Sequence, residues 1–298
     1  MVDLHMHSFY SDDGEFSPAE LVEKCAAAGI SLMSVTDHNC VRGTAEAREC
    51  ASRRGIRCLS GIEIDCRYSG LDFHLLGYGI DETCPAFAEI EQNVERQSEA
   101  ASRAMLRATQ ELGFAVTEAE MYALSAGHYY KNRWTGELFA EALLSRKEYL
   151  DHPLLLDYRK GGARGDNPYV NFYWDYYSQG KPGYYEMHYP SLEEVVGIIH
   201  RSGGAAVLAH PGVNLKGHEP LLAEIGALGI DGIEVCSSYH TPAIRDFYRL
   251  RAQALGLFCT GGSDYHGVIK PAIFLGEIGG AIEEAELCQK SALGKYLA

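Results

Sequence analysis

Short apolar runs suited to β-strands alternate with segments of helical spacing along much of this 298-residue chain. The helical segments at residues 18–29 and 44–55 each stop at a glycine, a residue that commonly ends a helix. Repeated strand, helix and strand units give a parallel sheet, and at this length they predict a closed or nearly closed β/α barrel. Seven strands are expected, at residues 2–7, 31–38, 56–65, 73–80, 205–211, 232–237 and 257–264.

The alternation stops between residues 83 and 190. Residues 87–113 have the spacing of a long helix and lead into further helical segments. Residues 166–189 carry many tyrosines without a clear period, so we expect an ordered loop that packs over the barrel mouth or a partner subunit. We therefore predict a barrel domain from residues 1–82 and 191–298, with residues 83–190 inserted as a mainly helical subdomain that covers the active site.

A formal net charge of -15 argues against a protein that grips long nucleic acid, because such binding depends on clustered lysine and arginine. A small phosphorylated substrate remains compatible if metal cations reverse the potential locally. The chain has no run of eighteen apolar residues and no basic leader with a cleavage site, so we expect a cytoplasmic protein without membrane contact. Nine scattered cysteines without a C-x-x-C pair are expected to be buried, reduced thiols: Cys25, Cys40, Cys50, Cys58, Cys66, Cys84, Cys236, Cys259 and Cys288.

Two histidines, His5 and His7, stand at the end of the first expected strand. Alternate residues of a strand point to the same face, so both imidazoles can reach one metal ion. The same spacing also fits two ordinary polar residues, so the pair needs support from elsewhere in the chain. That support comes from the later strand ends, which offer further ligand types: His38, Glu63, His74, His210, Asp264 and His266.

The carboxyl ends of barrel strands carry the active sites of barrel enzymes, whatever their chemistry. With Asp12, in the acidic loop Ser11-Asp12-Asp13-Gly14, the candidate ligands number nine. That is more than the three or four protein groups that one catalytic ion takes, so we expect two or three divalent ions with Glu63 as a candidate bridge. Imidazole and carboxylate ligands without thiolate suit Mn, Fe or Zn.

Paired metal ions can activate water and clamp the oxygens of a phosphoryl group during in-line attack, which favours phosphate ester hydrolysis. One alternative is a metal-dependent amidohydrolase or deaminase acting at a carbon centre, which also uses His-x-His at a barrel mouth. The pair Asp264-x-His266 and the lack of a lysine at a strand end count against that alternative. A non-catalytic binding module is a third class, but a degenerate site normally loses ligands and this one keeps all nine.

Six motifs near both ends of the chain carry a resemblance to a known family. The set DLHMHSFYSDDGEFSP, TDHN, GIE, FHLLGYGI, AHP and GGSDYHG resembles the PHP (polymerase and histidinol phosphatase) family. The resemblance implies a distorted (β/α)7 barrel, a cluster of two or three metal ions and phosphoesterase activity. The insertion resembles the group that acts on nucleotides and small phosphates, including enzymes that remove the 3'-phosphate of adenosine 3',5'-bisphosphate and the cyclic phosphate dihydrolases.

The resemblance also distributes the ligands among the ions. The first metal would be surrounded by His5, His7, Glu63 and Asp264. The second would be held by Glu63, His74 and His210. A third ion would be held by Asp12, His38 and His266. The family usually reads S-D-G, whereas this chain has two aspartates before the glycine, so the choice between Asp12 and Asp13 stays open.

Three positions are expected to contact the substrate. Arg133 lies in the insertion where relatives carry a phosphate-binding arginine, and its guanidinium fork suits a phosphate dianion. Lys181, in the segment GKPGY, matches a motif of the same group. His240 resembles a histidine beside the substrate that could protonate the leaving oxygen, so His240 and Asp264 are the candidate catalytic residues. Taken alone, the arginine and the lysine would be solvent-facing charges, and His240 would cap a helix.

These expectations combine into one hypothesis, a metal-dependent phosphoesterase for a small phosphorylated substrate. Such a substrate is an AMP-like nucleotide, a 3',5'-bisphosphate or a cyclic phosphate. A hydroxide bridging two ions would attack phosphorus while Arg133 and Lys181 hold the phosphate. The aromatic loop could stack a base or a sugar. The sequence favours no particular oligomeric state.

Overall fold

The computed structural model describes residues 1–282 together with Leu287 and Leu293. Its first sheet is parallel throughout, and the helices α1 (Pro18–Ala27) and α2 (Thr44–Arg53) connect its strands. Pro18 and the capping box of Ser17 with Glu20 start α1 where the sequence places a helix. The strand order is β1 (Val2–Asp3), β2 (Leu32–Ser34) and β3 (Arg57–Leu59).

The second sheet contains five strands in chain order: β4 (Gly61–Tyr68), β5 (Leu71–Tyr78), β6 (Ala205–Leu208), β7 (Gly232–Ser237) and β8 (Phe258–Gly262). The pairs β4–β5 and β5–β6 are antiparallel, and β6, β7 and β8 are parallel. The helix α7 (Leu192–Arg201) precedes β6, the helices α8 (Pro211–Asn214) and α9 (Leu221–Ala227) connect β6 to β7, α10 (Pro242–Leu255) connects β7 to β8, and the 3-10 helix η4 (Gly267–Ile269) follows β8.

The predicted parallel barrel therefore needs correction, because the described strands form two sheets and no closed barrel. The two-residue turn Ser69-Gly70 has positive φ at both positions, 51° and 79°, and such a turn joins adjacent antiparallel strands. The sheets still meet along two seams. Leu4 donates its backbone N–H to Gly261 at 3.0 Å, and His38 pairs with Glu63 in an isolated parallel bridge. Both seams lie beside candidate ligands, so they fix the backbone of the site.

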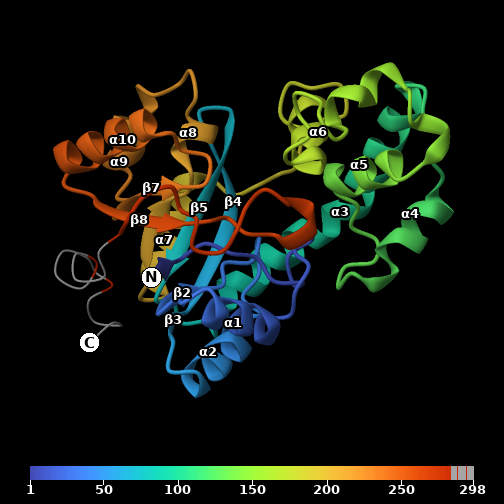
Figure 1. Cartoon of the computed structure of the whole chain (residues 1–298). Coiled ribbons are helices and arrows are strands. Elements are labelled where there is room, and N and C mark those ends of the chain that lie inside the picture. Colours follow the sequence, from blue (N-terminus) through green and yellow to red (C-terminus); the bar gives the residue numbers. More distant parts are fainter. Residues whose placement is uncertain (283–286, 288–292, 294–298) are drawn as a thin grey trace.

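A helical lobe, residues 85–176, lies to one side of the sheets (Figure 1). Its elements are α3 (Pro85–Glu111), α4 (Glu118–Leu124), η1 (Ser125–Gly127), α5 (Gly136–Leu144), η2 (Lys147–Tyr149), η3 (Pro153–Tyr158) and α6 (Pro168–Tyr176). The lobe has its own core, in which Trp134, Phe139 and Phe172 are buried. Part of the expected loop at residues 166–189 is thus the helix α6, because its aromatic side chains pack against α5.

The main core lies between the second sheet and the helices around it. Phe73, Leu75 and Val207 are fully buried there, and Phe87 at the start of α3 joins them. Leu106, further along α3, belongs to the core of the lobe, so this one helix connects the two cores. Within the described residues, no helix is both long enough and apolar enough to cross a membrane. Cys25, Cys40, Cys66, Cys236 and Cys259 are buried as expected, whereas Cys50, Cys58 and Cys84 are partly exposed, and Cys288 lies outside the described residues.

Asp3 provides a test of how the first strand is held. Its buried carboxylate accepts the backbone N–H groups of His5, Ser263 and Gly276 at 3.3, 2.9 and 2.8 Å. Asp3→Ala leaves these donors unpaired, so the free energy of unfolding should fall by about 3 kcal/mol or more. Urea denaturation of metal-stripped protein measures this, with the exposed Asp246→Ala as control. A loss no larger than that of the control would contradict the assigned role.

Candidate metal centre

Most of the candidate ligands follow the strands β1, β2, β6 and β8, whereas Glu63 and His74 lie within β4 and β5. His5 and His7 follow β1, and their imidazoles point to the same side because they are two residues apart along an extended chain. Both are fully buried, as are Glu63 and His266. Polar groups packed this densely away from water require partners of opposite charge. The charges of the cluster must therefore be balanced inside it.

The first group contains four ligand atoms. Nε2 of His5 and Nε2 of His7 lie 2.9 and 3.1 Å from Oε2 of Glu63. Oδ1 of Asp264 lies 3.3 Å from the first imidazole and 3.1 Å from the second. These four atoms lie within 4.8 Å of one another, a spacing that one metal ion can bridge. This is the set that the family resemblance implied for the first ion.

The second group uses the other oxygen of Glu63. Oε1 lies 3.0 Å from Nδ1 of His74 and 3.1 Å from Nε2 of His210. The structure therefore brings the predicted second set together as well. Because each Glu63 oxygen faces a different pair of histidines, this carboxylate has the geometry of a ligand shared by two ions.

The third group contains His7, Asp13, His38 and His266. Nε2 of His266 lies 3.0 Å from Oδ2 of Asp13, and the His266 ring stacks on His7 with centroids 3.9 Å apart. Asp12 instead faces Arg133, with Oδ2 3.9 Å from Nη1. Between the two aspartates left open by the sequence, the geometry places Asp13 among the ligands and Asp12 beside the arginine.

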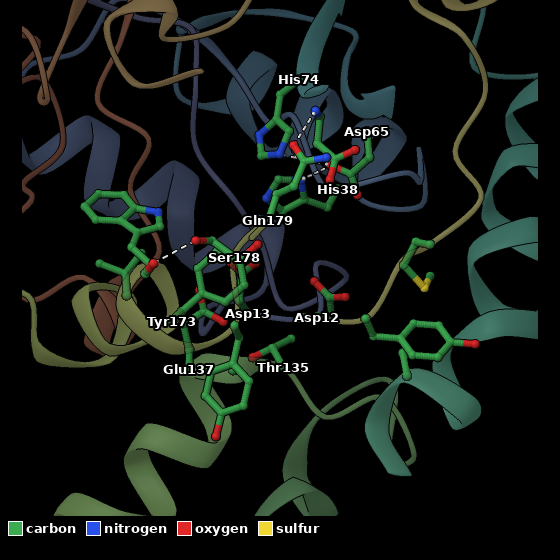
Figure 2. Close-up of a pocket in the computed structure, with 18 of the residues that line it drawn as sticks. Asp12, Asp13, His38, Asp65, His74, Thr135, Glu137, Tyr173, Ser178 and Gln179 are labelled. Carbon is green, nitrogen blue, oxygen red and sulfur yellow. Dashed lines mark hydrogen bonds and ion pairs between the residues drawn. The ribbon is translucent and has the colours of Figure 1, made fainter. Parts of the chain in front are cut away.

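Sequence reasoning missed Asp65, which forms a fourth group with His38 and His74. Its Oδ1 lies 3.2 Å from Nε2 of His74 and 3.7 Å from Nδ1 of His38. Figure 2 shows these three residues together on one side of the cavity. The missed signal is the spacing Glu63-x-Asp65, because alternate residues of β4 point to the same face.

A second missed residue is Glu234, in the otherwise apolar strand β7. It is fully buried, and its Oε1 lies 2.9 Å from Nδ1 of His5. Its Oε2 accepts the backbone N–H of His210 at 2.8 Å. His210 has a positive φ of 23°, a strained conformation for a side chain of its size. Glu234 therefore orients two candidate ligands from behind.

The protonation of the cluster reflects these contacts. Burial lowers the pKa of His7 to about 4, and the neighbouring His266 and His38 act in the same direction. Burial also lowers the pKa of His38, but Glu63 and Asp13 outweigh it and raise that pKa to about 9. Burial raises the pKa of Glu63, yet the facing histidines His5, His38 and His74 hold it well below its ordinary value. The buried Glu63 carboxylate therefore needs positive charge beside it to stay ionised.

A further observation supports metal binding by the candidate ligands. Several candidate ligand atoms are buried without a hydrogen-bond partner: His7 Nε2, Asp13 Oδ1, His38 Nδ1, Asp264 Oδ1 and His266 Nε2. Buried polar atoms are rarely left without partners in folded proteins. Imidazole nitrogens and carboxylate oxygens grouped in this way are the donors that Mn, Fe and Zn accept.

A cavity of about 510 Å³ opens from the cluster toward the helical lobe. Its size is in the range of a small-molecule site. His38 and His74 line one part, and Glu137 and Tyr173 of the lobe lie away from them, on the side where Asp13 is found (Figure 2). The cavity therefore lies between the two cores, with the candidate ligands on one wall and helices on the other.

Arg133 lines this cavity and has an unusual environment. The residue is 6% exposed, and its Nε and Nη2 atoms are buried without a hydrogen-bond partner. Its guanidinium carbon lies 3.7 Å from the ring centroid of Tyr130, which holds the group flat against an aromatic face. Unpaired guanidinium donors facing a cavity are suited to an anionic ligand.

The other two predicted substrate contacts are placed differently. Lys181 is exposed and is not among the residues lining the cavity. His240 is buried, but Nδ1 pairs with the carbonyl of Val235 at 2.8 Å and Nε2 accepts the N–H of Gly212 at 3.0 Å. With both ring nitrogens used by the backbone, His240 holds its own loop together. The described structure therefore brings neither residue to the cavity.

Residues 3–205 match the family model of the PHP domain. The chain belongs to the PHP domain family. The resemblance that rested on six short motifs is thereby confirmed, and the paired histidines of this PHP protein fall inside the matched region together with Glu63 and His74.

Curated relatives match this PHP protein over most of its length. A 3',5'-nucleoside bisphosphate phosphatase of Chromobacterium violaceum is 34% identical over 268 residues, covering 89% of this chain and 87% of the relative. A phosphoribosyl 1,2-cyclic phosphate 1,2-diphosphodiesterase of Eggerthella lenta is 30% identical, over 89% of this chain and 94% of the relative. A 5'-3' exoribonuclease of Haemophilus influenzae is 28% identical, over 89% of each. All three names denote cleavage of phosphate ester bonds.

A solved structure from Chromobacterium violaceum, described as an amidohydrolase with bound sulfate and no metal, is similar to this PHP protein. It is 32% identical, has a TM-score of 0.74, and the match covers 89% of this chain and 87% of that chain. Its description names the chemistry that we weighed as an alternative. The curated relatives, named for phosphate ester cleavage at comparable identity, favour phosphoester hydrolysis over that alternative.

The neighbouring aspartates allow a matched test of the third group. Asp13→Asn should weaken the binding of one divalent ion by about tenfold or more, because it removes a ligand charge while keeping the side-chain shape. Asp12→Asn should bind ions like the unchanged protein. Mn²⁺ titration of chelator-stripped protein, followed by thermal melting, measures both, since an ion bound only to the native state raises the melting temperature. The reverse ranking of the two variants would assign the ligand to Asp12.

Proposed function

We propose that this PHP protein is a metal-dependent phosphoesterase that hydrolyses a phosphate ester of a small phosphorylated substrate. A nucleotide, a 3',5'-bisphosphate or a cyclic phosphate is the substrate class in view. The observation that carries the proposal is the convergence of overlapping ligand groups on a cavity that is also lined by Arg133, whose Nε and Nη2 atoms lack hydrogen-bond partners. The named activities of the relatives support the same class of reaction.

We propose that two or three divalent ions, Mn, Fe or Zn, bind to the groups built around Glu63. The proposed ligands are His5, His7, Asp13, His38, Glu63, His74, His210, Asp264 and His266. Bound ions would polarise the phosphoryl oxygens and make water more acidic. The protein's own contribution is to hold these donors rigidly, through the sheet seams and through Glu234 behind them.

The residues around the cavity would bind and orient the substrate. Arg133 offers two free donors in a fixed plane, which matches two oxygens of a phosphate group. Asp264 lies at the cavity wall as both ligand and candidate catalytic group. We leave Lys181 and His240 out of the proposed site because neither lines the cavity.

The lobe would set the size and kind of substrate. Tyr173 lines the cavity and is partly exposed, so it offers a ring face on which a base could stack. The net charge of -15 supports a small substrate over a long nucleic acid, because no excess of cations exists to neutralise a chain of phosphates. We further propose that residues 83–190 are an insertion whose role is to complete the site that residues 1–82 and 191–298 begin.

A phosphate-release screen over nucleoside bisphosphates, cyclic phosphates, short oligonucleotides and nucleoside monophosphates tests the proposal. Ammonia release from amide and amine substrates, assayed in parallel, would support the amidohydrolase alternative instead. Protein purified without chelator and analysed for metals supplies the second arm of the test. Hydrolysis that persists unchanged in metal-stripped protein would overturn the proposal.

His7→Ala should reduce turnover by about 100-fold or more, because residues one shell further from a metal already contribute that much. His7 borders two of the ligand groups, so both lose a donor. The variant should keep a native circular dichroism spectrum. The control is His218→Ala at an exposed position. Turnover equal to that of the control would remove His7 from the site.

Arg133→Ala should lower kcat/KM by about 100-fold, in line with the loss of one fixed donor to a developing charge. Arg133→Lys should recover only part of this, because lysine keeps the charge and loses the planar fork. Steady-state kinetics with the best substrate of the screen measures both. The exposed Arg96→Ala serves as the control. Equal kcat/KM for the alanine variant and the control would show that the arginine does not reach the substrate.

A further inference from the structure

The two oxygens of the Asp264 carboxylate have different surroundings. Oδ2 accepts a hydrogen bond from the hydroxyl of Tyr239 at 2.5 Å and another from Nζ of Lys270 at 2.7 Å. Oδ1 is buried, has no hydrogen-bond partner, and faces His5 and His7 at 3.3 and 3.1 Å. One oxygen is therefore saturated by donors, and the other is left for the ligand group.

The backbone at Asp264 does not fix this orientation alone. Its φ is 59°, a left-handed conformation that aspartate, like asparagine, adopts more readily than most residues other than glycine. The backbone N–H is held by the carbonyl of His5 at 2.8 Å, which sets the position of the Cα atom. The rotation of the carboxylate is left to the contacts of its own oxygens. Those contacts come from two residues in different segments, one after β7 and one after η4.

Burial of the Lys270 ammonium group is energetically unfavourable unless the charge is paired. Lys270 is 6% exposed, and a buried ammonium ion loses most of its hydration energy. Its Nζ also lies 5.6 Å from the ring centroid of Tyr239, so the two donors support each other. Both residues line the cavity beside Asp264. A cation and a phenol on one carboxylate oxygen form what we call the Asp264 clamp, made of Tyr239 and Lys270.

The clamp also reaches the helical lobe. Trp174 of α6 packs edge-on against Tyr239, with ring centroids 5.8 Å apart and an interplanar angle of 68°. The phenol is thus held between a lobe residue and a candidate ligand.

We propose that Tyr239 and Lys270 are positioning residues that make Asp264 a one-oxygen ligand of the first metal group. This inference rests on the proposed metal centre. With Oδ2 occupied, only Oδ1 can approach an ion between His5 and His7. Without the clamp, the carboxylate could rotate or chelate with both oxygens, and the first group would lose its geometry.

Metal binding by the full-length protein tests the inference directly. Chelator-stripped protein is dialysed against a series of free Mn²⁺ concentrations, and bound manganese is counted by elemental analysis. Lys270→Met and Tyr239→Phe should each weaken one Mn²⁺ equivalent by about 10- to 100-fold and leave the other equivalents unchanged. Lys270→Arg should restore most of the affinity because it returns a cation to the same oxygen. Matched controls are Lys216→Met and Tyr68→Phe, at positions outside the cavity.

The double variant and the kinetics separate positioning from simple destabilisation. Because both residues act on one oxygen, the double variant should lose less affinity than the product of the two single losses. In Mn²⁺-saturated protein, kcat should fall with little change in KM, since the clamp touches a ligand and Arg133 still holds the substrate. Tyr239→Phe keeps the aromatic packing, so it decides the question even if Lys270→Met fails to fold.

Two results would contradict different parts of this inference. Affinities equal to those of the unchanged protein in Lys270→Met and Tyr239→Phe would overturn the clamp and leave the metal centre intact. An unchanged protein that binds no Mn²⁺, Fe²⁺ or Zn²⁺ would overturn the proposed function itself, and the clamp with it.

Discussion

The rest of the site depends on the buried carboxylate of Glu63. It has no exposed surface, and its two oxygens face different histidines at 2.9 to 3.1 Å. A carboxylate removed from water needs compensating positive charge nearby. Four histidines alone supply that charge only when they are protonated, whereas divalent ions supply it while leaving the imidazoles neutral. The surrounding ligands are therefore consequences of placing this one charge at the meeting point of two sheets.

The antiparallel hairpin gives that charge its neighbours. In the register of β4 and β5, Asp65 stands opposite His74, and Glu63 lies two residues away on the same face. A parallel pair would have separated these residues by a crossover connection, since parallel strands cannot be joined by two residues. The antiparallel pairing of β4 and β5, which departs from a regular barrel, therefore affects the chemistry of the site. It brings three ligand types from one continuous stretch of chain to the edge that His5 and His7 reach from the other sheet.

The sequence allowed the ligands to be predicted more fully than the architecture around them. Strand ends and the spacing of two residues are local properties, so His5, His7 and Glu63 could be expected together before any fold was known. The turn Ser69-Gly70 is a local signal as well, but the strand predictions did not use it. The different surroundings of Asp12, beside Arg133, and Asp13, beside His266, depend on the fold of their loop, which two adjacent aspartates in a sequence do not reveal. Burial of α6 against α5 is a tertiary effect that no periodicity of its sequence reveals.

The two walls of the cavity are held in place by different interactions. This difference explains why some predicted site residues reach the cavity and others do not. The ligand wall is fixed by backbone hydrogen bonds between strands, so a motif there determines position. The lobe wall is fixed by packing of aromatic side chains in a separate core. A motif in the lobe therefore predicts which residue types are present, but not the direction in which their side chains point. Arg133 reached the cavity because Tyr130 holds its guanidinium, while Lys181, in an exposed turn, has no such support. The carboxylates and imidazoles are therefore held by the strands, and the residues opposite them by the core of the lobe.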